Sequence, residues 1–326
     1  MLKYTIKRIL WMIPVILMVI IIVFSIMYFS PGDPVKYILG SNITPEIYAA
    51  KKADMGLDKP FLVQLFNYLK NIILHFDFGV SYVNNRSVIT QIGERLGITI
   101  VISVCSTIIS QFIAIPAGIA AAKKQGRLTD YFFTSLSVIL AAIPGYLLAV
   151  FAMLLFCAKL KWFPAAGVED WKGFILPIFC GIFGHAASTC RMTRSSMLEV
   201  IRSDYVRTAR AKGVPEKVVI NKHALNNALI PVLTMLGMHL SGCVAGSILI
   251  ETIFTVPGMG VLMRTAIASF DYPLVQGCII ITSMCVAVLS LLTDLAYAIV
   301  DPRVHDQMSG GKKKKKKKTD SEVAAV

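Results

Sequence analysis

The sequence lacks the motifs on which most enzymes and metal sites depend. No Gly-x-x-x-x-Gly-Lys-Ser/Thr segment occurs, so the chain has no P-loop for binding ATP. It contains neither a His-Glu-x-x-His motif nor a Cys-x-x-Cys pair of the kind that binds zinc. All seven cysteines lie in apolar stretches, which argues against a disulfide framework in an outer loop. We therefore expect a protein without catalytic residues, a metal or another cofactor.

Charged residues are also scarce, at 16% of the chain against 56% hydrophobic residues. The mean hydropathy of +0.67 lies well above that of a soluble domain. Windows without Lys, Arg, Asp or Glu account for this value, and they cover residues 9–30, 98–122, 131–158, 173–190, 224–250 and 272–293. A membrane-spanning helix needs about 20 apolar residues, and of these windows only 173–190 is shorter.

These windows predict an all-α polytopic membrane protein with six transmembrane helices. The first window is too long for the apolar core of a signal peptide and ends in a poor cleavage site, so we expect a retained anchor. The helix of 173–190 is expected to run on into the basic segment that follows. The predicted organisation is a cytoplasmic end and first helix (1–30), an extracytoplasmic insertion of about 65 residues (31–97), a five-helix core with a cytoplasmic loop (98–305, loop 191–223) and a disordered, Lys-rich cytoplasmic tail (306–326).

The distribution of charge predicts the orientation in the membrane. With the N-terminus inside, cytoplasmic segments carry 22 Lys and Arg against 8 acidic residues, whereas outer segments carry 11 against 10. Cytoplasmic loops of membrane proteins are enriched in Lys and Arg, so both termini are expected in the cytoplasm. The net charge of +14 therefore reflects topology, and no basic and aromatic patch indicates nucleic-acid binding.

The outer segment contains one amphipathic pattern. Pro60 is a typical helix-start residue, and apolar residues follow it at helical spacing. These residues are Phe61, Leu62, Leu65, Phe66, Leu69, Ile72 and Ile73. We expect this helix to lie along the outer membrane surface or against the transmembrane bundle.

Loop 191–223 contains a second amphipathic pattern, which predicts a helix from Leu198 to Gly213. Its apolar face comprises Leu198, Ile201, Tyr205 and Ala209, and its arginines lie away from that face. Gly213 is expected to end the helix with a positive φ, because Pro215 follows two residues later. From the pattern alone, this segment is either a solvated connector or a helix that docks into another protein.

Motifs at five places resemble the dipeptide/oligopeptide branch of ABC importer permeases, over nearly all of residues 1–305. The Ala-x-x-x-Gly element at Ala209–Gly213, with the Asn-Ala-Leu-Ile-Pro that ends at Pro231, is similar to the "EAA" coupling loop of these permeases. The other motifs occupy residues 55–60, 77–82, 251–277 and 301–303. Arg207 replaces the Glu of the general consensus, and the spacing from Gly213 to Pro231 exceeds that of the sugar-importer branch. Both departures fit the peptide branch.

The resemblance implies the type I ABC importer permease fold and a permease subunit of an ATP-driven importer for di- or oligopeptides in a bacterial inner membrane. It implies as partners a second homologous permease subunit, two ATP-binding subunits, an extracytoplasmic substrate-binding protein and membrane lipid. Nickel chelates, glutathione and oligosaccharides are alternative cargoes. The residues that it implies for coupling to the ATP-binding subunits are Ile201, Asp204, Tyr205, Arg207, Ala209, Arg210, Lys212 and Gly213.

An ion-coupled secondary transporter is the rival hypothesis, since such proteins hold ionisable residues within the membrane. The six windows contain no acidic residue, and Asp294 follows the last of them. It either pairs with Arg303 or another neighbour or serves as a coupling carboxylate. His185 and His239 are the residues within the windows that titrate near neutral pH. His239 either forms an interhelical hydrogen bond or lines the path. The candidates for the translocation path are Gln111, His239, Ser241 and Gln276.

Overall fold

The computed structural model describes residues 2–40 and 44–300, and these are helical almost throughout. Four helices are long and apolar enough to cross a membrane, namely Thr5–Phe29, Val88–Lys123, Lys172–Ile201 and Tyr272–Leu295. Two bent helix pairs raise the number to as many as six, if each pair counts as one span. The prediction of an all-α membrane protein is confirmed, with four to six candidate spans in the part of the chain that the structure describes.

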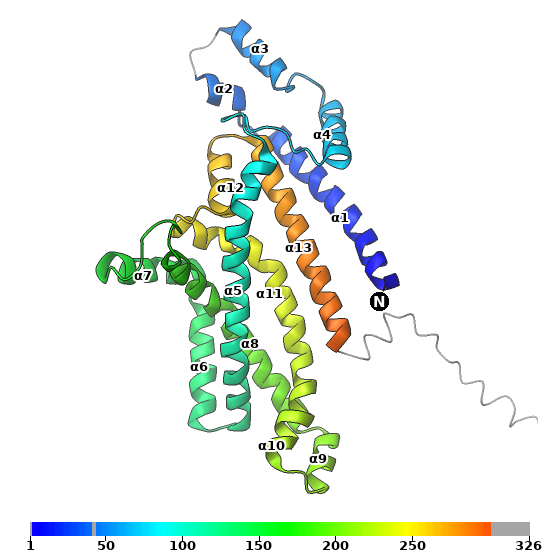
Figure 1. Ribbon diagram of the computed structural model, residues 1–326, viewed down its shortest axis with the longest axis vertical. Coiled ribbons are helices and arrows are strands. Elements are labelled where there is room, and N and C mark those ends of the chain that lie inside the picture. The colour runs from blue at the N-terminus through cyan, green and yellow to red at the C-terminus, as the bar shows by residue number, and fades with distance from the viewer. Residues whose placement is uncertain (1, 41–43, 301–326) are drawn as a thin grey trace, which may run out of the picture.

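Figure 1 labels the α-helices in chain order, and two π-helical turns, η1 and η2, lie between them. The elements are α1 (Leu2–Phe29), α2 (Pro34–Leu39), α3 (Pro45–Asp54), α4 (Phe61–His75), α5 (Val88–Lys123), α6 (Leu128–Ala142), α7 (Gly145–Ala152), η1 (Met153–Lys159), α8 (Lys172–Ile201), α9 (Asp204–Ala211), α10 (Glu216–Val218), η2 (Val219–Ala224), α11 (Leu225–Ile253), α12 (Met259–Ala268) and α13 (Tyr272–Val300). The tail 306–326 and the motif at 301–303 lie outside the described residues.

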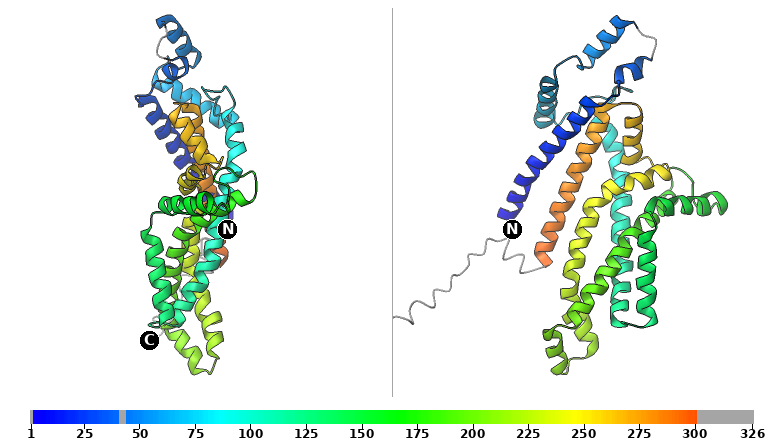
Figure 2. Two further views of the ribbon diagram at one scale, coloured as in Figure 1. Left: turned by 90° about the vertical axis from the view of Figure 1, so that its left-hand side faces the viewer. Right: turned by 180° about the vertical axis from the view of Figure 1, so that it is seen from behind.

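The chain turns sharply within window 131–158, at Pro144. The helix pair is bent by 92° at the break, and α7 projects sideways from the bundle (Figures 1 and 2). A proline ring disfavours the α-helical region for the residue before it. Ile143 accordingly adopts φ −82° and ψ 121°, an extended conformation that ends α6.

The fourth window belongs to a longer helix, as predicted. α8 begins at Lys172 and continues through the start of the basic loop to Ile201. It packs closely along α5 at Gly118, where an added Cβ would lie 2.6 Å from Thr193 Cβ and 2.7 Å from the Cys190 carbonyl oxygen. Small residues of this kind allow two membrane helices to approach each other.

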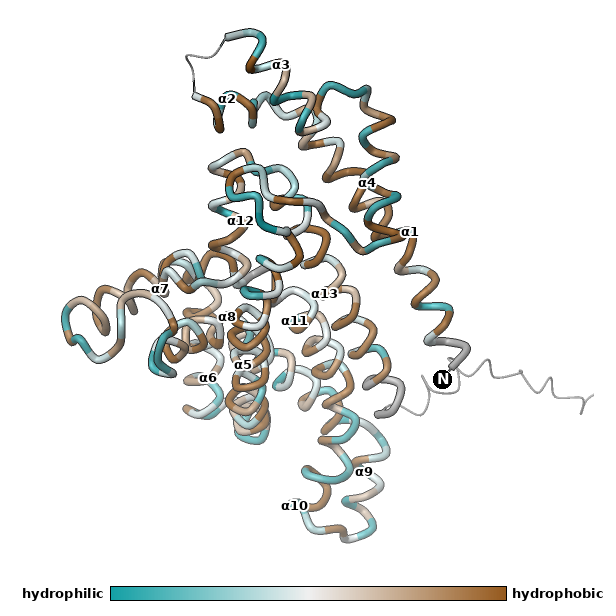
Figure 3. The backbone as a smooth tube through the Cα atoms, turned by 45° about the horizontal axis from the view of Figure 1, so that its top comes forward, coloured by the Kyte–Doolittle hydropathy of each residue, from teal (hydrophilic) through white to brown (hydrophobic). Residues whose placement is uncertain are grey.

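The elements outside the apolar helices gather at opposite ends of the bundle. α2, α3 and α4 lie at one end, near α12, whereas α9 and α10 form the other end (Figure 1). Apolar residues dominate the helices between these ends, and polar residues are common on α9 and α10 (Figure 3). The outer segment and the coupling segment of the sequence prediction are therefore far apart.

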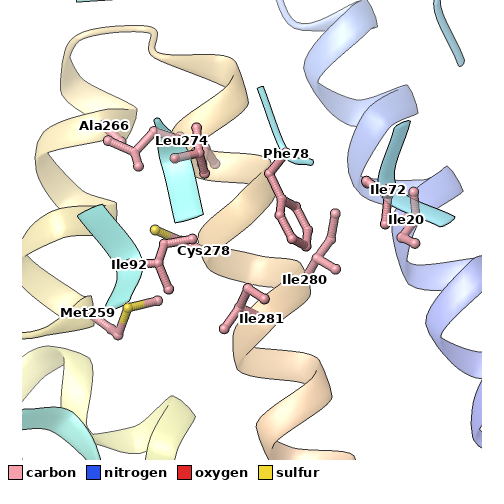
Figure 4. Packing of buried hydrophobic residues seen from close by; sticks show 12 residues of the cluster. Ile20, Ile72, Phe78, Ile92, Met259, Ala266, Leu274, Cys278, Ile280 and Ile281 are labelled. Atoms are coloured by element: carbon pink, nitrogen blue, oxygen red, sulfur yellow. The ribbon is translucent and has the colours of Figure 1, made fainter. Parts of the chain in front are cut away.

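A buried apolar cluster anchors the outer segment to the long helices. Ile72 of α4 and Phe78 after it share this cluster with Ile20 of α1, Ile92 of α5 and Ile280 of α13 (Figure 4). α4 thus packs against the bundle, which was one of the two predicted positions. Pro60 precedes the helix rather than occupying its first turn.

We expect Gly118→Ala to destabilise the packing of α5 against α8, because the new methyl group would meet backbone as well as side-chain atoms. Overpacking of this kind costs about 1–3 kcal/mol. Gly97→Ala is the matched control on the same helix, since no atom lies within 4 Å of its Cβ position. Thermal unfolding of the purified full-length chain measures both variants. Equal midpoints for the two would contradict close α5–α8 packing.

Candidate functional site

The predicted coupling segment forms a helix of its own, α9. The prediction that this helix begins at Leu198 was wrong, because α8 extends to Ile201 and a short break follows. Ser203 in this break is extended, and its hydroxyl donates to the Val200 carbonyl at 2.6 Å. Ile201 therefore belongs to the long helix, whereas the other predicted coupling residues lie on α9 or in the turn after it.

α9 docks onto the bundle through two small side chains. Val206 is fully buried and Ala209 is 9% exposed. They share an apolar cluster with residues of α5, α8, η2 and α11, namely Ala122, Met197, Val219, Ile220, Ala224 and Ala228. Tyr205 was predicted on the same face as Ala209 but is exposed, because the docked face of α9 is centred between Val206 and Ala209 and leaves Tyr205 at its edge. Its hydroxyl accepts a hydrogen bond from Asn227 Nδ2 of α11 at 2.8 Å.

The turn after α9 requires a glycine. Gly213 has a φ of +75°, which confirms the predicted left-handed helix end. Its amide donates to the Arg210 carbonyl at 2.9 Å, and the Val214 amide donates to the Ala209 carbonyl at 3.3 Å. No atom lies within 4 Å of the position that a Cβ would occupy. The backbone conformation, and not the available space, therefore demands glycine here.

The outward face of α9 and the turn after it are basic and accessible. Arg207 and Asp204 lie 3.9 Å apart, with side chains that are 72% and 100% exposed, and Lys212 is exposed as well. Arg210 forms two hydrogen bonds with Glu216 at 3.0 and 2.9 Å, which raise the pKa of its guanidinium group. An exposed pair of this kind contributes about 0–1 kcal/mol, so it orients Arg210 more than it stabilises the fold.

An ion pair that sequence analysis missed lies near the same end of the bundle. Asp130 of α6 is buried and accepts hydrogen bonds from Arg194 of α8 at 2.5 Å (Nε) and 2.8 Å (Nη2). The Gly126 amide and the Thr134 hydroxyl also donate to Asp130, at 3.0 and 3.3 Å. These contacts tie the α5–α6 turn to α8, the helix that leads into α9. No local sequence pattern signals the pair, because its members are 64 residues apart.

The two glutamines predicted for the translocation path lie in different cavities. Gln276 of α13 lines a cavity of about 870 Å³ on the side of α2, α3 and α4. Gln111 of α5 borders a separate pocket of about 410 Å³ next to Leu236 of α11. Its Nε2 donates to Ser110 Oγ at 3.1 Å, and its Oε1 is buried without a hydrogen-bond partner among the described residues.

His239, the third path candidate, forms an interhelical contact. Its Nε2 lies 3.2 Å from the Ser188 hydroxyl of α8, and its ring centroid lies 4.5 Å from that of His185. Its Nδ1 is buried and has no hydrogen-bond partner among residues 2–40 and 44–300. Ser241 is half-buried on the same helix as His239. Of the four path candidates, no two are joined by a hydrogen bond within the described chain.

Asp294 pairs with a neighbouring helix. Its carboxylate lies 3.0 Å from Arg8 Nη1, so the pair connects the end of α13 to the start of α1. Arg303, the partner named first in the sequence prediction, lies outside the described residues. This ion pair gives Asp294 a structural role, which explains why an acidic residue occurs near the end of an apolar helix.

Two carboxylates between the apolar windows 224–250 and 272–293 are fully buried. Glu251 accepts hydrogen bonds from Ser247 Oγ at 2.9 Å and from the Gly260 amide at 2.7 Å, which joins α11 to α12. Asp271 accepts from Ser81 Oγ at 2.5 Å and from the Tyr82 amide at 3.0 Å, which joins the outer segment to α13. Charge patterning alone could not reveal these contacts.

Two family models match this chain. The "binding-protein-dependent transport system inner membrane component" model covers residues 114–306, and the corresponding N-terminal model covers residues 1–103. The second match therefore includes the outer segment, and the first includes α9 and the Gly213 turn. Together they account for nearly the whole helical part of the chain.

Curated relatives are similar over almost their full length. The glutathione transport system permease protein GsiC of Salmonella typhimurium is 36% identical over 304 residues, which cover 93% of this chain and 99% of the relative. A Brucella suis biovar 1 protein, assigned by its name to a peptide transport system as a permease, is 38% identical over 92% of this chain and 98% of its own length. The chain belongs to the family of binding-protein-dependent transport system inner membrane components, the membrane permeases of ABC importers, which are not themselves catalytic.

Proposed function

We propose that this chain is a permease subunit of an ATP-driven importer for di- or oligopeptides. It forms half of a translocation path with a second homologous permease subunit, and six of its helical spans cross the membrane in the type I arrangement. Two ATP-binding subunits contact α9, and an extracytoplasmic binding protein delivers the cargo. The observation that carries this proposal is α9 itself, a short basic helix held on the bundle at the end opposite α2, α3 and α4.

Coupling follows from the contacts of α9. Val206 and Ala209 pack against residues of α5, α8, η2 and α11, so a displacement of α9 pushes on several long helices together. Arg207 and Lys212 remain exposed and can contact an acidic or polar groove of an ATP-binding subunit. Rigid-body movement at such an interface is a common way of switching between two states. We assign the coupling role to Ile201, Asp204, Tyr205, Arg207, Ala209, Arg210, Lys212 and Gly213.

Glutathione is the strongest alternative cargo, because several relatives are named for its transport. It is itself a small peptide, so the two proposals share their chemistry. The peptide proposal is supported by the Brucella suis relative and by the peptide-branch motifs at α9. Uptake of labelled tri-alanine and labelled glutathione by cells with and without the transporter distinguishes the two cargoes.

We propose that residues 31–97 lie outside the cytoplasmic membrane and residues 191–223 in the cytoplasm, with both termini inside. The excess of Lys and Arg on the proposed inner side supports this orientation.

Substitution of Gly213 should uncouple transport from ATP hydrolysis. Valine disfavours the left-handed conformation by about 1–3 kcal/mol, so Gly213→Val should distort the end of α9 while the chain still inserts. We expect the assembled transporter to lose substrate-stimulated ATPase activity. Gly167→Val is the matched control, because Gly167 has a φ of +77°, no atom within 4 Å of its Cβ position and a place in the loop between η1 and α8. Normal coupling and uptake in Gly213→Val would exclude the proposed role.

Single cysteines test the proposed orientation. Asn84 and Lys212 are both exposed, and we expect an impermeant thiol reagent to label Asn84→Cys but not Lys212→Cys in intact cells. The background lacks the seven native cysteines. Permeabilised cells serve as the control, since both positions should then react. Labelling of position 212 alone in intact cells would reverse the orientation.

The double substitution His239→Gln, Asp294→Asn separates an ABC importer from an ion-coupled transporter. It removes the two titrating groups that are the strongest candidates for ion coupling, leaves His185 in place, and retains hydrogen-bonding capacity. We expect partial uptake that resists collapse of the proton gradient and stops when ATP is depleted. Wild-type uptake that followed the proton gradient without ATP, together with complete loss in the double variant, would refute the ABC mechanism for this chain.

A further inference from the structure

A cavity of about 870 Å³ lies on the side of the bundle opposite α9 and serves no role in the coupling described above. Its walls are the end of α1, the segments α2, α3 and α4, the loop 77–82 and the start of α13. This volume is within the range of about 300–1,000 Å³ that small-molecule sites occupy. The cavity differs from the pocket at Gln111, which is lined almost wholly by apolar side chains.

α4 turns a polar face towards this cavity. Gln64, Asn67, Tyr68 and Asn71 line it, and their spacing of three or four residues places them on one side of the helix. The other faces of α4 are apolar. Leu62, Phe66 and Ile73 are exposed there, whereas Ile72 is buried. The amide and hydroxyl groups of the polar face can donate to and accept from peptide groups.

The cavity also offers charges of both signs. Lys52 of α3 lines it and forms no ion pair with any residue of 2–40 or 44–300. Asp77 lines it as well; one of its oxygens accepts from the Gly79 amide at 2.8 Å, and it forms no ion pair within the described residues. The neighbouring Lys51 is already paired with Asp54 at 2.8 Å. Lys59, before α4, also lines the cavity and forms no ion pair within the described residues. Two cations and one carboxylate therefore remain for a ligand that carries both charges.

Five tyrosines complete the lining: Tyr28, Tyr48, Tyr68, Tyr82 and Tyr272. Burial raises the pKa of Tyr68, and burial together with Asp271 raises the pKa of Tyr82 to about 12, so both stay protonated and neutral. The Tyr68 hydroxyl is buried and has no hydrogen-bond partner in the described chain. Such neutral hydroxyls and aromatic faces suit an uncharged peptide backbone with side chains.

We propose that this cavity is an outer binding site for short peptides with free termini, lined by this chain and reaching the path candidate Gln276 of α13. Lys52 binds the terminal carboxylate, Asp77 binds the terminal ammonium group, and the polar face of α4 binds the amide groups between them. The inference rests on the proposed function as a peptide importer, and it adds a cargo site on the permease itself.

Equilibrium binding of radiolabelled tri-alanine to the complete transporter in nanodiscs, without its binding protein, tests this site. We expect Lys52→Met and Asp77→Asn each to weaken binding about tenfold, since hydrogen bonds to charged groups contribute on that scale. Acetyl-tri-alanine amide should bind about tenfold more weakly or worse, and Lys52→Met should not weaken it further. Lys70→Met is the matched control, because Lys70 lies on α4 but does not line the cavity.

A second variant guards against misfolding. Asn71→Trp fills the cavity from an exposed position, and Leu74→Trp places the same side chain on α4 outside the lining. We expect Asn71→Trp to abolish tri-alanine binding and Leu74→Trp to leave it unchanged. ATP-dependent uptake by the wild type is measured alongside and should be present. Unchanged tri-alanine affinity in Asn71→Trp, Lys52→Met and Asp77→Asn, with wild-type uptake intact, overturns the cavity proposal alone.

Other outcomes are equally decisive. In one of them, the wild type binds no tri-alanine and Asn71→Trp binds the extracytoplasmic binding protein more weakly. That result overturns the proposal and indicates that a loop of the binding protein occupies the cavity. Absence of ATP-dependent peptide uptake in the wild type refutes the proposed function instead, and that assay does not depend on any cavity variant.

Discussion

Backbone hydrogen bonding in a membrane is the constraint on which the rest of this structure depends. The interior of a bilayer offers no water to peptide groups, so every apolar stretch has to satisfy them within a helix. A break in such a helix therefore needs a specific local cause. At Ile143 the cause is the following residue, Pro144. Because lipid and side chains are equally apolar, close approach of helices has to come from small residues, and Gly118 supplies it between α5 and α8.

Buried carboxylates hold the ends of these helices in place. An unpaired buried charge is strongly unfavourable, so Glu251, Asp271 and Asp130 are retained only where donors surround them. Glu251 and Asp271 receive backbone amides and serine hydroxyls around α12, which fixes the outer segment above the long helices. Asp130 receives Arg194 and thereby fixes the turn beside α8. These hydrogen bonds and this ion pair therefore hold both ends of the bundle in position.

The two proposed functional regions lie at these two ends. α9 contacts the long helices through Val206 and Ala209, and the cavity lies between α4 and the start of α13. α8 and α11, which meet at Ser188 and His239, connect the α9 end to the middle of the bundle. α9 itself contacts both helices through the cluster around Val206 and Ala209, which supports the proposed coupling role.

The sequence by itself determined the helical membrane class, the long apolar helices, the amphipathic α4 and the need for a positive φ at Gly213, because each depends on local composition or backbone chemistry. It also carried the family motifs, since these are contiguous. Tertiary structure alone decided the rest. The docked face of α9 is centred between Val206 and Ala209, and the contacts with the long helices decide this, so Val206 is buried and Tyr205 is exposed. The pairs Asp130–Arg194 and Arg8–Asp294, and the contacts of Asp271, join residues far apart in the chain, and only packing of the helices brings such groups together.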